Sequence, residues 1–125
     1  MGQYWKVINL DKKQYLNGHD LDCGLKLWEQ IANPRVGQAL VILLAAQPER
    51  RGGGDIEPDP IIGSWAGDRI VMVGDYSEDE DLPSVPEFGS LYAHTYPKNE
   101  TEDGVEPYTN VSANVRRVLD RELSR

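Results

Sequence analysis

The order of its short apolar segments constrains most strongly what this chain of 125 residues can fold into. The longest uninterrupted apolar run, residues 39–46, is eight residues long, far short of the roughly 18 that a membrane-spanning helix needs. A chain of this length is expected to form one domain around one core. We therefore expect a single globular domain over residues 1–125, in which several short elements share that core.

Two pairs of strand-like runs predict two β-hairpins. Residues 4–10 are rich in β-branched and aromatic side chains, and a similar run resumes at residues 14–17 after a short polar break. Residues 61–65 and 69–74 form the second pair, separated by a compact turn that contains glycine. Residues 90–96 are expected to add a short edge strand.

Three segments have the periodicity of amphipathic helices. The first covers residues 23–32, and the second covers residues 34–47, where an Asn-Pro pair suits a helix start. The second segment contains the run LVILL, which would equally suit a buried strand. The third begins at Asn110 and continues to the C-terminus. The first helix would bury one apolar face, made of Leu25, Leu27, Trp28, Ile31 and Ala32.

Two segments are predicted to be long loops. Residues 48–60 and 77–107 are rich in proline and acidic residues, and the first also contains three consecutive glycines. The strands and helices do not alternate regularly, as they would in a parallel α/β sheet. The sequence therefore predicts an α+β fold, with a small antiparallel sheet built from two hairpins, packed by about three helices and carrying long acidic Pro/Gly loops.

The acidic residues are concentrated in one part of the chain. The net charge is -8, but residues 75–106 contain ten acidic residues against Lys98 alone. Nucleic acids and anionic membranes both need a contiguous face of Lys and Arg, so neither is an expected partner. A localised negative field favours cations or a basic protein partner. The alternative is a solvated acidic loop that keeps the protein soluble.

The N-terminal residues and the number of cysteines indicate the cellular compartment. The first twenty residues scatter charges where a signal peptide would need an apolar block. Cys23 is the only cysteine and cannot form an internal disulfide. We expect a cytoplasmic protein.

One segment gathers groups that could carry chemistry. His19, Asp20 and Asp22 lie just before Cys23, at the start of the first predicted helix. A helix N-terminus favours a thiolate, and His19 could act as its base, but a lone cysteine is more commonly a small buried hydrophobe. His19, Cys23 and His94 lack the paired spacing of a zinc site. No catalytic residue is assigned and no cofactor is predicted, with a divalent metal as the alternative.

Two further features involve charged residues. Arg51 precedes three glycines, whose amides could approach an anionic ligand, but the spacing of phosphate-binding loops is absent and a flexible linker is favoured. Lys26 and Glu29, three residues apart on the first predicted helix, are expected to form a surface pair.

Several motifs together resemble a group of small uncharacterised proteins from bacteria, phages and fungi. They are MGQY followed by an aromatic residue and KV, then HD before GLKLWE, and then an apolar strand that ends in GDY. The resemblance covers most of the chain up to Asp79, and the group has no established function. It implies a set of recurring polar positions that would form either a binding site or an internal network: His19, Asp20, Lys26, Glu29, Asp75 and Tyr76.

Two hypotheses of function follow. The leading one is a small, non-enzymatic binding or regulatory module of the inhibitor, immunity or adaptor type, whose acidic residues engage a basic protein partner. Foremost among these residues are Glu78, Asp79, Glu80 and Asp81. The alternative is a hydrolase or a protein that binds a small ligand, nucleotide or metal. Its pocket would lie where His19 and Asp20 meet the strand end at Asp75 and Tyr76, with Arg51 or Lys26 contacting an anionic group.

Overall fold

The computed structural model describes residues 2–125, which fold around a sheet of four strands. Strand β1 (Trp5–Asn9) lies between β2 (Gln14–Leu16) and β3 (Ile70–Gly74) and is antiparallel to both. Strand β4 (Thr109–Asn110) pairs with β2 in parallel, so the order is β3-β1-β2-β4. The predicted α+β class is confirmed, but the sheet is mixed because a long connection, rather than a hairpin, brings β4 to its edge.

Three α-helices accompany the sheet. They are α1 (Leu27–Ala32), α2 (Arg35–Leu44) and α3 (Ser112–Leu123), and α2 packs against α3. The second predicted segment is therefore a helix and not a strand, and the C-terminal helix begins two residues after its predicted start.

The first helix differs from its prediction in both length and orientation. Residues 18–21 form a 3₁₀ helix, η1 (Gly18–Leu21), and α1 begins only at Leu27. Leu21, Cys23 and Leu25 fill the core from the connecting segment, so none of the residues of α1 is buried. Of the predicted inner face, Leu25 is buried as expected, but the prediction is wrong for the four residues of α1, which are exposed: Leu27, Trp28 (73% exposed), Ile31 and Ala32.

The second predicted hairpin is wrong, because residues 61–65 form turns rather than a strand. The contacts of Trp65 hold this segment in a turn. Its side chain is fully buried, and its indole N–H donates to Gln14 Oε1 at 2.7 Å. The backbone N–H of Trp65 donates to the carbonyl of Leu43 near the end of α2. This turn is held against α2, and β3 pairs with β1 instead.

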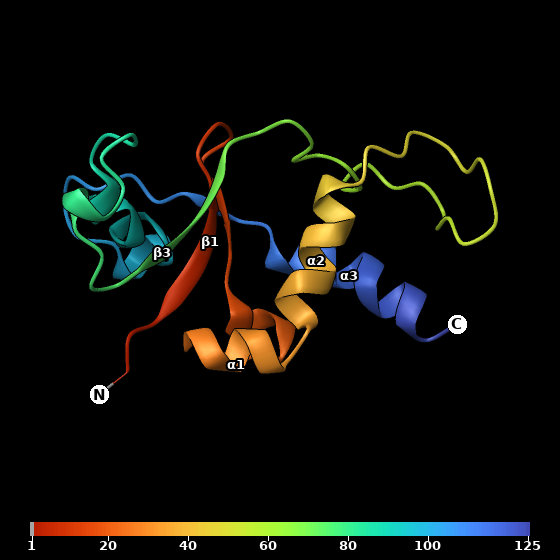
Figure 1. Ribbon diagram of the computed structural model, residues 1–125, viewed down its shortest axis with the longest axis horizontal. Coiled ribbons are helices and arrows are strands. Elements are labelled where there is room, and N and C mark those ends of the chain that lie inside the picture. The colour runs from red at the N-terminus through yellow and green to blue at the C-terminus, as the bar shows by residue number, and fades with distance from the viewer. Residues whose placement is uncertain (1) are drawn as a thin grey trace.

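The sheet separates two layers (Figure 1). Helices α2 and α3 cover one face, where Val7 of β1 joins a core cluster with Leu43, Trp65 and Val118. The other face is covered by the 3₁₀ helix η3 (Phe88–His94), where Ile8 of β1 joins Val73, Phe88 and Leu91. Adjacent residues of one strand thus serve opposite cores, as the alternation of side chains along a strand requires.

The acidic part of the chain contains short helices. Besides η3, it forms η2 (Asp79–Asp81) and η4 (Lys98–Glu100), so the edge strand predicted for residues 90–96 is wrong. With three residues per 3₁₀ turn, Phe88 and Leu91 lie on one side of η3 and pack on the sheet. Residues 45–69 contain neither helix nor strand. Among residues 2–125, no helix has the length and apolar character to cross a bilayer.

Candidate functional site: a caged lysine beside an acidic layer

Lys6 is buried between the sheet and η3. It shares one face of β1 with Ile8, and its side chain points into the η3 layer, where the residue is 5% exposed. Its Nζ donates a hydrogen bond to the carbonyl oxygen of Thr95 at 2.7 Å. Lysine is almost never buried unless it is paired, so this position identifies a specialised environment.

Three tyrosine rings surround the ammonium group, and we call them the tyrosine cage: Tyr15, Tyr92 and Tyr96. Lys6 Nζ lies 4.8 Å from the ring centroids of both Tyr92 and Tyr96, and 5.7 Å from that of Tyr15. Cations at this distance are attracted to the faces of aromatic rings. The rings of Tyr92 and Tyr96 also meet edge to face, at 5.7 Å and 72°. The cage therefore joins β1, β2 and the end of η3 around one charge.

Burial and nearby carboxylates act on Lys6 in opposite directions. The pKa of Lys6 is lowered from 10.5 to about 8, because the effect of burial outweighs the smaller opposing effects of Asp20, Glu100 and Asp75. Burial also raises the pKa of Tyr92 and Tyr96. At neutral pH the cage therefore holds a protonated ammonium between uncharged phenols.

Two of the predicted site residues approach the cage from opposite segments. Asp75 Oδ1 accepts a hydrogen bond from the backbone N–H of Tyr4 at 2.9 Å, and the N–H of Asp75 donates to the carbonyl of Tyr4. Asp20 Oδ2 accepts from Asn110 Nδ2 at 2.8 Å. Both carboxylates thus have structural partners while their charges act on the same ammonium group.

The other predicted site residues do not converge with these two. His19 is exposed on η1, and Tyr76 is exposed after β3. Glu29 accepts a hydrogen bond from the backbone N–H of Lys26 at 3.0 Å, so this pair caps α1 through the backbone. Arg51 lies 3.6 Å from Glu49, in a loop that extends away from the sheet beyond α2 (Figure 1).

The four residues predicted to bind a partner lie at η2. All are exposed, but Asp79 Oδ1 accepts from the N–H of Gly89 and Asp81 Oδ2 accepts from the N–H of Glu78. Glu80 has no side-chain hydrogen bond within residues 2–125. The carboxylates therefore shape the turn and also project negative charge.

Ion pairs are distributed unevenly over the molecule. Outside residues 75–106, most carboxylates pair with Lys or Arg, as Asp120 does with Arg35 at 2.8 Å. Inside this range, which we call the acidic layer, Glu106 pairs with Lys13 at 3.4 Å. The other nine acidic residues of this layer have no ion-pair partner in the part of the chain that the structure describes. Most of the charge that residues 2–125 leave unpaired thus lies on this layer.

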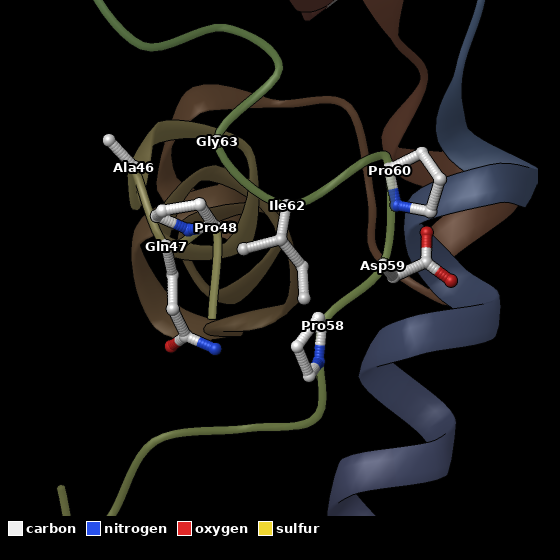
Figure 2. Close-up of a pocket in the computed structure, with 8 residues that line it drawn as sticks. All are labelled: Ala46, Gln47, Pro48, Pro58, Asp59, Pro60, Ile62 and Gly63. Atoms are coloured by element: carbon white, nitrogen blue, oxygen red, sulfur yellow. The ribbon is translucent and has the colours of Figure 1, made fainter. Parts of the chain in front are cut away.

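A hollow of about 570 Å³ lies beyond the end of α2 (Figure 2). Two stretches of the segment 45–69 face each other there, and prolines and Ile62 form much of the wall. Its only titratable residue is Asp59, whose carboxylate accepts from the N–H of Ile61 and pairs with Arg117 at 2.8 Å. The lining therefore leaves no carboxylate free for acid-base chemistry.

Cys23 is not placed as a nucleophile would be. It is buried, and burial raises the pKa of its thiol. Its Sγ lies 3.8 Å from the carbonyl of Glu29 and 3.9 Å from that of Asn33, so carbonyl oxygens face the sulfur and disfavour the thiolate. Among residues 2–125, no three His, Cys, Asp or Glu side chains are grouped so that they could hold a metal ion.

Lys6 and the tyrosine cage were not identified from the sequence. The alternation of β1 places Lys6 on the same face as the apolar Ile8, which is an unusual position for lysine. That signal identifies a buried or paired lysine, but the rings of Tyr92 and Tyr96 come from a segment that was expected to be loop and edge strand.

Comparison of the chain with protein-family models, with curated proteins and with solved structures found no match. The geometry of the site is therefore the basis for what it can do.

Proposed function

We propose that this protein is a non-enzymatic binding module of the inhibitor, immunity or adaptor type, which engages a basic protein partner in the cytoplasm through its acidic layer. The observation that carries the proposal is the contrast in ion pairing within residues 2–125. Most carboxylates outside the acidic layer pair with Lys or Arg, whereas nine carboxylates in the acidic layer have no such partner there. A concentrated, unpaired negative field speeds the encounter with a positively charged partner.

The acidic layer is held in a defined position. Phe88, Leu91 and Tyr92 of η3 are buried against the sheet, and Lys6 ties the end of η3 to β1 through Thr95. Because η3 is packed on the sheet, the charges carried by this part of the chain are already ordered before the partner binds, which reduces the entropy lost on binding. A loop whose only role is solubility needs no such packing.

The proposal is tested with two matched double variants. Glu80→Gln with Glu102→Gln removes two charges from the acidic layer, at side chains that form no hydrogen bond within residues 2–125. Glu49→Gln with Glu57→Gln removes two charges from the exposed loop beyond α2. Proteins captured from the source cells by the wild-type chain are identified, and their association rates are measured at 50 and 300 mM salt, about a twofold change in Debye length.

We expect the captured partner to have a basic surface, and the acidic-layer variant to associate several-fold more slowly at low salt with a weaker salt dependence. The loop variant should associate like the wild type. An unchanged association rate in the acidic-layer variant, or an equal decrease in both variants, would contradict the proposal.

A further inference from the structure

A groove of about 380 Å³ lies at the β4 edge of the sheet and shares two residues with the tyrosine cage. We call it the edge groove. Its walls come from β2, β4 and the segments on either side of η4, and they are mainly aromatic rings and prolines. The residues that characterise it are Tyr15, Tyr96, Pro97, Pro107, Tyr108 and Thr109.

Two aromatic rings of the groove, those of Tyr96 and Tyr108, are held in place by contacts with side chains outside the groove. Tyr96 lies over Lys6 Nζ at 4.8 Å and meets the edge of Tyr92. Tyr108 stacks on His94 with 4.4 Å between ring centroids and 13° between planes. His94 is itself tied by its Nδ1 to the carbonyl of Glu106 at 2.5 Å. A ligand that packs on these rings would therefore meet surfaces that need little further ordering.

The unpaired charge at the rim of the groove is acidic. Glu100 ends η4, and Asp20 accepts a hydrogen bond from the groove residue Asn110. Glu106, which directly precedes Pro107, is paired with Lys13 at 3.4 Å. Lys98 is the only basic residue in the lining. Tyrosine rings and prolines inside, with carboxylates at the rim, are complementary to a peptide that combines prolines with arginine or lysine.

We propose that the edge groove binds a proline-rich segment of the partner, in polyproline II conformation and with arginine or lysine beside the prolines. This inference rests on the proposed function and names the kind of segment that the basic partner presents. The polyproline II conformation of such peptides is already formed before binding, and their backbone stays solvated. They therefore bind by packing their proline rings between the aromatic side chains of a groove. Their basic residues would lie against Glu100 and Asp20.

Addition of a peptide strand to the sheet edge is less well supported. Strand β4 contains only Thr109 and Asn110, too short a ladder for several main-chain hydrogen bonds. The N–H of Thr109 already donates to the carbonyl of Lys13, and that of Val111 to the carbonyl of Tyr15. At this edge a peptide is therefore expected to bind by packing on the tyrosine rings and by contacts with carboxylates, and not by hydrogen bonds to the backbone of β4.

The first test is selection from a library of random twelve-residue peptides displayed on phage, with the 125-residue chain as target. The inference expects enriched peptides with prolines three residues apart and at least one arginine or lysine beside them. Enrichment of basic peptides without proline would overturn this inference and leave the proposed function intact. Enrichment of acidic or purely apolar peptides, or no enrichment, would also overturn this inference, whereas the proposed function is decided separately by the association rates of the acidic-layer variant.

The second test measures the affinity of one selected peptide by fluorescence anisotropy. Tyr108→Ala removes a groove ring, and Thr109→Arg adds a positive charge at an exposed groove position without disturbing the core. Each should weaken binding at least about tenfold, as loss of an interface anchor does. The matched controls Tyr76→Ala and Asn114→Arg, at exposed positions outside the groove, should leave the affinity unchanged.

Thermal unfolding of each variant separates loss of the groove from loss of the fold. If Thr109→Arg melts like the wild type and still binds the peptide with wild-type affinity, the edge groove is not the binding site. An equal loss for Asn114→Arg, on the opposite layer, would show a nonspecific effect of charge and would also overturn the inference.

Discussion

Lys6 is the residue at which the sheet and the acidic layer are joined. Its Nζ binds the carbonyl of Thr95 and faces three tyrosine rings, while the charges of Asp20, Asp75 and Glu100 act on it from outside. Desolvation is the largest effect on its pKa, so the ammonium is held at a cost that the rings and carboxylates offset only in part.

The stability of the wild type should rise with pH between about 8 and 10. Below pH 8 Lys6 is charged in both the folded and unfolded chains; between its folded pKa of about 8 and its ordinary value of 10.5, only the unfolded chain keeps the proton. The free energy of unfolding therefore increases over this window. Above pH 10 it should fall again, because buried Tyr92 and Tyr96 have raised pKa values and resist ionisation.

Urea unfolding at several pH values tests this, with Lys6→Met as the informative variant. The variant should lose the rise between pH 8 and 10 and keep the fall above pH 10. Lys98→Met, at an exposed position, should keep both. A rise of the same size in Lys6→Met and in the wild type would show that Lys6 is not the titrating group.

At the scale of elements, the end of α2 is fixed by the turn that follows residue 60. The N–H groups of Gly63 and Trp65 donate to the carbonyls of Ile42 and Leu43 at the last turn of α2. Gly63 has a φ of +73°, and a Cβ built there would lie 2.5 Å from the carbonyl oxygen of Ala45. Glycine is therefore required for this contact between helix and turn.

Alanine should have opposite effects at two glycines near α2. Gly63→Ala should lower the free energy of unfolding by about 1–3 kcal/mol, because the backbone is strained and the methyl group collides with the helix end. Gly37→Ala, inside α2 with nothing within 4 Å of its Cβ position, should raise it by about 0.5–1 kcal/mol. Equal effects of the two substitutions in urea unfolding would contradict this account.

The short helix α1 shows why an amphipathic pattern does not ensure burial. Its apolar residues repeat as in a helix that packs on a core, yet the core positions are already occupied by Leu21, Cys23 and Leu25 from the preceding segment. The capping hydrogen bond from the backbone N–H of Lys26 to the side chain of Glu29 fixes the start of α1 at Leu27, four residues after the predicted start. Its apolar side chains consequently face outward.

Two tryptophans provide a matched test of this orientation. Trp28→Ala should change the free energy of unfolding by no more than about 0.5 kcal/mol, since Trp28 is 73% exposed. Trp65→Ala should cost about 3–5 kcal/mol, because that side chain is fully buried and its indole binds Gln14. Urea unfolding followed by far-ultraviolet circular dichroism measures both. A large loss for Trp28→Ala would mean that α1 packs with its apolar face inward.

At the scale of the whole molecule, charge is divided between the two sides of the sheet. The helical side carries paired charges, such as Asp120 with Arg35 and Arg116, whereas the acidic layer leaves most of its carboxylates unpaired. Like charges gathered in one part of a molecule repel one another and destabilise the compact state. A surface that keeps this repulsion is consistent with a role for the charge in binding.

The Glu80→Gln and Glu102→Gln double variant should therefore be more stable than the wild type, although it should bind the proposed partner more slowly. The expected gain is about 0.2–0.5 kcal/mol at low salt, and it should disappear at 0.5 M NaCl because salt screens the repulsion. Asp120→Asn is the control, since it breaks ion pairs and should lower the stability. A loss of stability in the double variant would indicate that these carboxylates support the fold.

The sequence by itself determined the features that depend on residues close together in the chain. The hairpin of β1 and β2, the helix α3, and the concentration of acidic residues in 75–106 all follow from local propensity, periodicity or composition. For α2 the periodicity favoured a helix but left a buried strand open, and the structure decided for the helix. These signals act over a few residues, and at these places no tertiary contact overrides them, as the burial of Trp65 does for residues 61–65.

Only the tertiary structure decided which faces are buried and which distant residues meet. The parallel pairing of β4, the outward face of α1, the burial of Trp65 and the tyrosine cage each depend on contacts between segments far apart in sequence. Lys6 illustrates the reason. A lysine in a strand is normally solvated, and this one is buried only because η3 brings Tyr92, Thr95 and Tyr96 over the sheet.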